Sequence, residues 1–183
     1  NNIMEKTDVV LVQNFQWETA KTNLEPDFVN NDKIVFNRDD QAIFKAINEY
    51  RMFNTRELVY TDKEIADISY NEPNYYVTLY QDHSRQFKQY FDKSDFNGRY
   101  AISNREGWES VTDADYTWVD FSLPVNTNLT PDKVYLYGEL TNWAFDSNSK
   151  MDFNADEMQY EKSLLLKQGV YNYRYVLKEE TSK

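Results

Sequence analysis

The residue types that usually carry catalytic chemistry are scarce in this sequence. Its 183 residues contain a single histidine, His83, and no cysteine. His83 stands between Asp82 and Ser84, but neighbouring residues on an extended chain point to opposite faces, so adjacency alone does not build a triad from these three. The sequence therefore predicts a surface or turn histidine, and it offers no thiolate nucleophile and no cysteine-ligated zinc site.

Carboxylates are the remaining catalytic candidates, and no pair of them stands out. The 31 acidic residues offer many pairs of the kind that hydrolyse glycosides. The stretch 93–98 comes nearest to a calcium loop, yet it places Lys93 where the first acidic ligand belongs and Asn104 where the bidentate glutamate belongs. We therefore predict a chain that is not an enzyme, with no catalytic residues, no metal site and no cofactor.

Composition and charge indicate which kinds of protein this chain could be. Twenty basic against 31 acidic residues give a net charge of −11, which leaves no basic stripe for phosphates and argues against nucleic acid as a partner. Fifteen tyrosines and eleven phenylalanines beside only four glycines favour extended strands. No apolar run approaches the roughly 18 residues of a membrane-spanning helix. The sequence starts without a methionine or a signal peptide, which we interpret as a processed or excised piece of a longer protein.

Short segments rich in β-branched and aromatic residues predict strands in the first part of the chain. They cover residues 9–15, 33–37, 57–60 and 75–80. The segment 39–50 is ambiguous, because Ile43, Ala46 and Ile47 have helical spacing behind the potential caps Asp39 and Asp40. A short helix near 39–47 and an extended segment both remain open.

A polar, glycine-containing passage over residues 96–115 marks the predicted domain boundary. Beyond it, the apolar and polar residues of 117–123 alternate as in a half-buried strand, and 134–138 predicts another. Residues 160–167 and 170–177 flank Gln168 and Gly169 and predict a hairpin. We therefore predict an all-β chain of two immunoglobulin-like β-sandwich units, residues 1–110 and 111–183, of which the second is short for such a sandwich.

Aromatic side chains are the best candidates for a binding site. Trp143 follows a strand end, where a tryptophan either covers the sandwich or offers its face to a sugar ring or a protein. We expect it to be at least partly packed on its own unit, near Gly138. Three tyrosines share one strand face, which is either a covered core face or, if exposed, a binding patch. The candidate partner- or glycan-binding residues are Asn142, Trp143, Tyr171, Tyr173 and Tyr175.

The last third of the chain resembles the glycogen- and starch-binding E-set sandwich modules. The similar stretches are GELTNW at 138–143, the strand at 160–167 and GVYNYRYV at 169–176. The sequence departs from that family at Leu140, where phenylalanine is usual, and it lacks the second, downstream tryptophan. This resemblance implies an E-set fold and, as the alternative function, a carbohydrate-binding module for α-glucans.

Eight motifs, in order along residues 8–178, resemble the type IX secretion system plug protein family. They are VQNFQW at 12–17, TNLEP at 22–26, NEYRMF at 48–53, QDHSR at 81–85, DFNG at 95–98, DYTWVDF at 115–121, GELTNW at 138–143 and LLLKQGVYNY at 164–173. The resemblance implies an all-β protein of the Gram-negative periplasm, associated with the outer membrane. Its implied partner is the translocon barrel protein, whose periplasmic mouth it closes when no cargo is passing. It also implies further β-sequence before residue 1 and an extended segment at 48–53.

Overall fold

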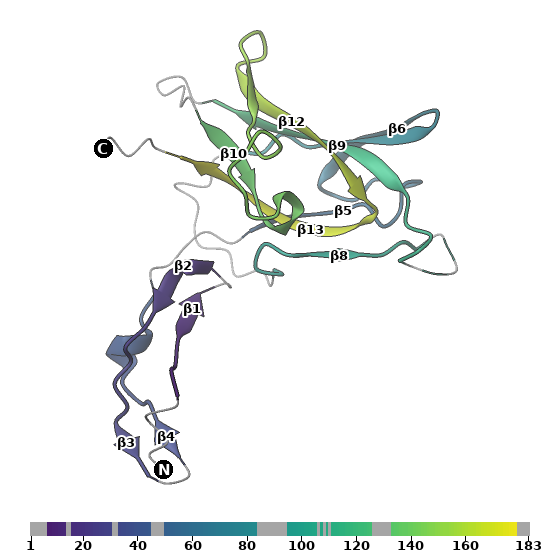
Figure 1. Cartoon of the computed structure of the whole chain (residues 1–183). Coiled ribbons are helices and arrows are strands. Elements are labelled where there is room, and N and C mark those ends of the chain that lie inside the picture. The colour runs from purple at the N-terminus through teal and green to yellow at the C-terminus, as the bar shows by residue number, and fades with distance from the viewer. Residues whose placement is uncertain are drawn as a thin grey trace. The chain divides into compact units, whose positions relative to one another are not determined.

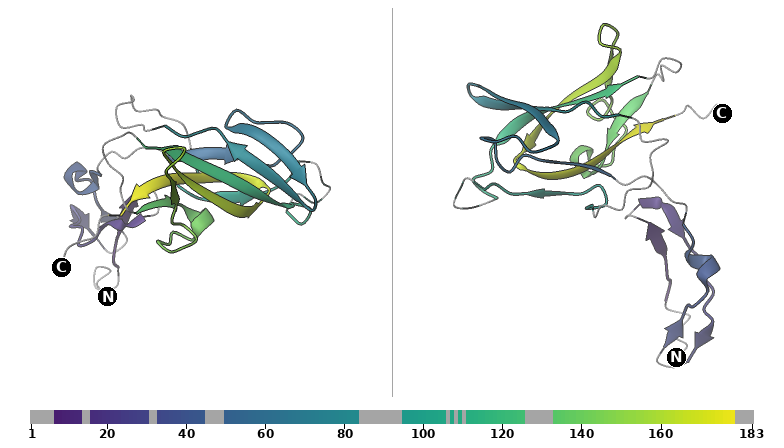
Figure 2. Two further views of the ribbon diagram at one scale, coloured as in Figure 1. Left: turned by 90° about the horizontal axis from the view of Figure 1, so that it is seen from above. Right: turned by 180° about the vertical axis from the view of Figure 1, so that it is seen from behind.

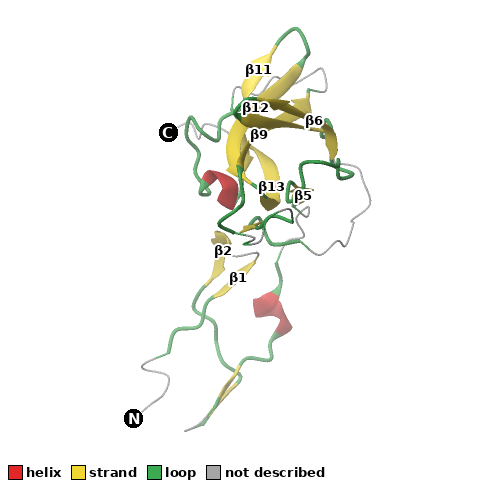
Figure 3. Cartoon of the chain, turned by 90° about the vertical axis from the view of Figure 1, so that its right-hand side faces the viewer, coloured by secondary structure: helices red, strands yellow, loops and turns green. Residues whose placement is uncertain are grey.

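The computed structural model describes residues 7–13, 16–30, 33–44, 50–83, 95–105, 107, 109, 111–125 and 133–178. In this part of the chain nearly all regular structure is strand, with two short 3-10 helical turns (Figure 3). The predicted all-β sandwich class is confirmed. The chain divides into two units, Asn1–Ile47 and Asn48–Lys183, and each is described by itself.

The first unit contains two small antiparallel sheets. β1 (Leu11–Gln13) pairs with β2 (Gln16–Lys21), and β3 (Phe28–Val29) pairs with β4 (Ile34–Val35). A single 3-10 turn, η2 (Asp39–Ala42), follows, and Ile43 after it is extended. Among the described residues 39–44 of the helix considered near 39–47, only this turn is helical, and residues 45–49 lie outside the described part. None of the residues of this unit whose burial is described is buried.

A five-stranded sheet forms one layer of the second unit (Figure 1). Its strand order is β11 (Asp152–Asn154), β12 (Gln159–Lys167), β9 (Tyr116–Pro124), β7 (Asn74–Leu79) and β6 (Ile65–Asn71). All neighbours are antiparallel except β7 and β9, which are parallel. The alternation predicted for 117–123 is confirmed, because Thr117, Val119 and Phe121 are buried.

The second layer is built around β13 (Gly169–Leu177) (Figures 1 and 2). The first half of β13 pairs with β5 (Arg51–Asn54) and β8 (Tyr100–Ile102), and its second half pairs with β10 (Val134–Tyr137). A short turn, η3 (Glu139–Thr141), follows β10. Within the range 48–53, for which an extended segment was implied, residues 51–53 are extended in β5, and residues 48 and 49 lie outside the described part.

The core lies between the inner faces of these two sheets. Phe53 of β5 stacks on Tyr171 of β13, with ring centroids 5.1 Å apart, and meets Phe121 of β9 edge-on at 5.5 Å. These rings join aliphatic side chains from both layers in one buried cluster that includes Ile65, Val77, Val119, Leu136 and Met151. Aromatic packing of this kind contributes beyond the burial of apolar area.

The predicted hairpin of 160–167 with 170–177 is wrong. β12 pairs with β9 and β11, whereas β13 pairs with strands of the other sheet, so the chain crosses between the layers at Gln168. Gln168 is buried; its N–H donates to the Asp115 carbonyl at 2.8 Å, and its Oε1 accepts the Asp115 N–H at 3.0 Å. The apolar faces of both strands are thereby buried against each other across the core.

The division of the chain also differs from the predicted boundary at 110/111. Strands before residue 110 complete the sheets of strands after it: β7 pairs with β9, and both β5 and β8 pair with β13. The structure divides at 47/48 instead. Residues 57–60, predicted as a strand, are not in a strand, and 58–60 form a bend. The strand β6 was not predicted. The side chain of Leu58, in that bend, is buried in the core, which explains why this segment contains apolar residues.

Candidate binding surface

Tyr171, Tyr173 and Tyr175 lie on one face of β13, and we call them the tyrosine ladder. This face is turned toward the core. Tyr171 is 2% exposed and Tyr173 is 4% exposed, while Tyr175 is half-buried. The Tyr171 hydroxyl donates to the Lys167 carbonyl at 2.5 Å, and burial raises the pKa of this hydroxyl. Of the two interpretations open from the sequence, the covered core face is the one present, so the ladder is not a platform for a ligand.

Asp82 joins the ladder to the opposite sheet. Its Oδ2 accepts the hydroxyls of Tyr173 at 2.6 Å and Tyr175 at 2.8 Å, and its Oδ1 accepts the guanidinium of Arg51. Its N–H donates to the Ser122 carbonyl on β9 at 3.1 Å. Burial raises the pKa of both tyrosines, and the nearby carboxylate raises it further. Asp82 is therefore a structural link, while His83 is exposed, as predicted.

Trp143 packs on its own unit, as expected. It follows η3 in a left-handed turn, with φ of 51° at Asn142 and 57° at Trp143, and its N–H donates to the Gly138 carbonyl at 3.0 Å. The half-buried indole meets the ring of Tyr137 at 5.4 Å and that of Tyr50 at 6.3 Å between centroids. Asn142 is exposed beside it.

The backbone at Gly98 and the rings of Tyr50 and Tyr137 hold the indole in this position. A Cβ at Gly98 would lie 2.4 Å from the Trp143 ring, so the ring rests directly on backbone that only glycine leaves open. The Arg174 guanidinium lies over Tyr50 and Tyr137, 5.3 and 5.1 Å from their centroids. Part of the indole is consequently covered by its own unit.

An exposed apolar surface lies on the outer face of the five-stranded sheet and was not predicted. Tyr76, Trp118 and Leu165 are direct cross-strand partners on β7, β9 and β12. Tyr116 lies on the same face of β9, two residues before Trp118. Leu165 is 45% and Tyr116 55% exposed, and the other two are half-buried. We call these four residues the apolar row. The second sheet packs against the opposite face of the five-stranded sheet (Figure 1). The apolar row therefore points away from the core, which lies between the sheets.

A polar groove adjoins the apolar row on the same face. It encloses about 300 Å³ and its lining includes Thr78, Asp120, Ser122, Gln159, Glu161 and Ser163. The next cross-strand set after Tyr76, Trp118 and Leu165 is Thr78, Asp120 and Ser163, so the groove and the row are contiguous. The alternation in the sequence predicts that Trp118 and Asp120 face outward. The parallel pairing of β7 with β9, which places Tyr76 beside Trp118, could not be predicted from the sequence.

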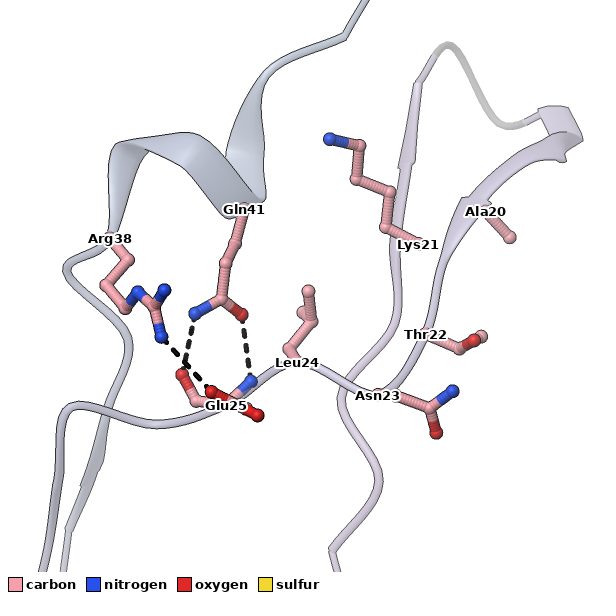
Figure 4. A pocket seen from close by; sticks show the side chains of 8 residues that line it. All are labelled: Ala20, Lys21, Thr22, Asn23, Leu24, Glu25, Arg38 and Gln41. Carbon is pink, nitrogen blue, oxygen red and sulfur yellow. Dashed lines mark hydrogen bonds and ion pairs between the residues drawn. The ribbon is translucent and has the colours of Figure 1, made fainter.

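The first unit has an open pocket of about 510 Å³ (Figure 4). Its polar groups mainly bind one another. Gln41 Nε2 donates to the Glu25 carbonyl at 2.9 Å, the Glu25 N–H donates to Gln41 Oε1 at 2.8 Å, and Arg38 contacts the Glu25 carboxylate at 3.2 Å. These contacts tie η2 to the segment after β2, and we assign no ligand to the pocket.

The described residues contain neither a metal-binding cluster nor a membrane-spanning helix. Among them, no group of three or more His, Cys, Asp or Glu side chains could hold a metal ion. No helix formed by these residues is long and apolar enough to cross a membrane.

Comparison with known proteins supports the fold rather than an activity. No family model and no curated protein matches the chain. It is similar to the crystal structure of a hypothetical protein from Parabacteroides merdae, with 36% sequence identity and a TM-score of 0.78. The match covers 96% of this chain and 44% of that protein. The chain therefore spans less than half the length of a protein whose description gives no function.

Proposed function

We propose that this chain is a non-enzymatic protein-binding module of the type IX secretion plug kind. In this proposal it docks in the periplasm beneath the outer-membrane translocon barrel and closes it while no cargo passes. The motif resemblance supplies the partner. The observation that carries the binding role is the apolar row, an exposed aromatic strand face on a chain whose tryptophan turn is packed on its own unit.

The apolar row has the composition of a protein interface. Trp and Tyr are enriched at protein–protein interfaces and account for much of their binding energy. β7, β9 and β12 each have neighbouring strands on both sides, so side chains rather than open backbone edges must make the contacts. The cross-strand register sets Tyr76, Trp118 and Leu165 side by side, which suits a broad apolar patch on another protein.

The surroundings of the row suit a reversible contact. Ser69 on β6, Thr78 on β7 and Ser163 on β12 are exposed polar residues on the same face. A plug has to leave when cargo arrives, and such interfaces are moderate in size with a polar rim. The row with its polar border agrees with that requirement.

The alternative function, α-glucan binding through Trp143, has less support. Stacking on a sugar needs a free ring face, whereas the indole of Trp143 lies on Gly98 and against Tyr137 and Tyr50. The turn also has Leu140 where that module family usually has phenylalanine.

Co-purification from cells tests the proposal. The full-length natural protein, and its Trp118→Ala and Leu165→Asp variants, are each recovered with the translocon from cells lacking cargo and from cells overproducing it. We expect the wild type to be recovered without cargo and depleted with it, and both variants to be lost. Tyr60→Ala, which alters an exposed tyrosine in the bend before β6, is the matched control and should behave as wild type.

Melting curves separate a folding defect from a binding defect in these variants. Recovery of the wild type in neither state, in an organism that has the translocon, would remove the plug assignment. Retention of both row variants would instead show that another surface makes the contact.

A further inference from the structure

The groove beside the apolar row holds two carboxylates on neighbouring strands. Asp120 on β9 faces Ser163 on β12, and Glu161 lies two residues from Ser163 on that strand. Such diagonal neighbours have side chains about 7–8 Å apart. Both residues are half-buried, so water screens the repulsion between their charges less than on an open surface.

Neutral donors hold each carboxylate in place. Ser163 Oγ donates to Asp120 Oδ1, and Glu161 Oε1 accepts Asn154 Nδ2 at 3.1 Å and Gln159 Nε2 at 2.6 Å. Among the described residues no lysine or arginine pairs with either carboxylate. Lys162 also lines the groove, but its Nζ donates to the Ser147 carbonyl at 2.9 Å.

The groove and the row form one surface with two halves of different chemistry. The apolar half carries a cation at its far end, where Lys167 Nζ lies 5.6 Å from the ring centroid of Tyr116. The polar half carries Asp67 and Asp152 in addition to Asp120 and Glu161, since Asp67 pairs with Thr78 and Asp152 with Glu161. Charge on this face is therefore negative on the groove side.

We propose that the protein partner of the apolar row inserts a lysine or arginine side chain into the groove, between Asp120 and Glu161. This inference rests on the proposed function and names the chemistry of the partner surface: an apolar patch bordered by a basic residue. Charge complementarity selects this occupant, because a cation relieves the repulsion between the carboxylates and the groove volume admits a long side chain. Two carboxylates supply too few oxygens for a protein-bound Ca²⁺ ion, which takes six to eight.

The first test uses a defined cationic probe, hexalysine, and a ¹⁵N-labelled chain. We expect the largest amide shift changes at Ser122, Glu161 and Ser163, and their loss in the Asp120→Asn/Glu161→Gln variant. The isosteric changes keep the hydrogen-bond acceptors and remove two charges. Asp156→Asn/Glu157→Gln removes two charges from the exposed turn before β12 and is the matched control. Shift changes spread evenly over the acidic surface would overturn the inference.

The second test measures binding of the same proteins to the detergent-purified translocon at several salt concentrations. We expect the groove variant to bind roughly tenfold more weakly at low salt, with a flatter salt dependence, and the control variant to stay within about twofold of wild type. Equal behaviour of the groove and control variants, with Trp118→Ala still abolishing binding, would remove the inference and leave the proposed function. No binding by the wild type, with hexalysine still mapped to the groove, would remove the translocon as partner and leave the groove chemistry.

Discussion

The hydroxyl of Tyr173 donates to the carboxylate of Asp82, with 2.6 Å between Oη and Oδ2, across 91 positions of sequence. Asp82 belongs to the segment after β7 and its N–H donates to Ser122 of the five-stranded sheet. Tyr173 belongs to the centre of the other sheet. Asp82 therefore joins both layers of the sandwich, because its backbone N–H binds one sheet and its carboxylate binds the other.

Asp82→Ala should lower the free energy of unfolding by about 3 kcal/mol, as expected when one partner of a largely buried ion pair is removed. The change leaves the guanidinium of Arg51 without its carboxylate and the hydroxyls of Tyr173 and Tyr175 without their acceptor. Removing one partner of a largely buried pair costs more than the pair contributes, because the other charge stays desolvated. Urea denaturation measures the loss, with Asp156→Ala as an exposed control expected within about 0.5 kcal/mol of wild type. A loss below about 1 kcal/mol would contradict a linking role.

Stability should fall as the pH rises above about 10, the ordinary pKa of tyrosine. Burial first, and then neighbouring charge, raises the pKa of Tyr171, Tyr173 and Tyr175 in the fold. The unfolded chain then loses these protons at a lower pH than the folded chain, so their contribution is complete below pH 10 and declines above it. Denaturant midpoints between pH 8 and 11 measure this. Full tyrosinate absorbance at 295 nm in a chain that remains folded would argue against it.

Sequence patterns predict strands well where one face is buried and poorly where the chain changes sheets. The alternation of 117–123 identified β9, because Thr117, Val119 and Phe121 all face the core. Gln168 and Gly169 have the character of a hairpin turn, yet the buried side chain of Gln168 binds Asp115 and directs the chain into the other layer. Local pattern does not distinguish these outcomes, since the partner is 53 residues away.

The candidate binding surface could likewise be predicted from the sequence only in part. Trp118 and Asp120 are visible in the sequence as the outward residues of an alternating strand. Their neighbours Tyr76 and Thr78 come from a parallel strand, and the register of that pairing depends on the whole sheet. The position of Trp143 after a strand end leaves both a packed and a presented ring open, and its packing depends on Gly98, Tyr50 and Tyr137. The burial of the tyrosine ladder likewise depends on the five-stranded sheet that covers it.

Trp143→Ala should cost about 2 kcal/mol of stability, below the range for a fully buried tryptophan because the indole is half-buried. The lost contacts are those with Tyr50, Tyr137 and the backbone at Gly98. Binding to the translocon should persist, since the apolar row belongs to the other sheet. Thermal melts and affinity electrophoresis in glycogen gels are the two measurements. An unchanged melting temperature together with lost glycogen retention would favour the α-glucan alternative.

Amides of the first unit should exchange with deuterium far faster than those of β9 and β12. None of its residues whose burial is described is buried, its paired strands are short, and Trp17 is 74% exposed. Two-stranded sheets without a covered face are marginally stable in water, so their amides open readily. In the longer protein that the plug resemblance implies, additional β-sequence would cover this apolar surface, and the same amides should then gain protection. Hydrogen exchange with mass spectrometry on both proteins, with their oligomeric state measured in parallel, makes the comparison. Protection of β1 to β4 equal to that of β9 in the 183-residue monomer would show that the first unit is stable without such cover.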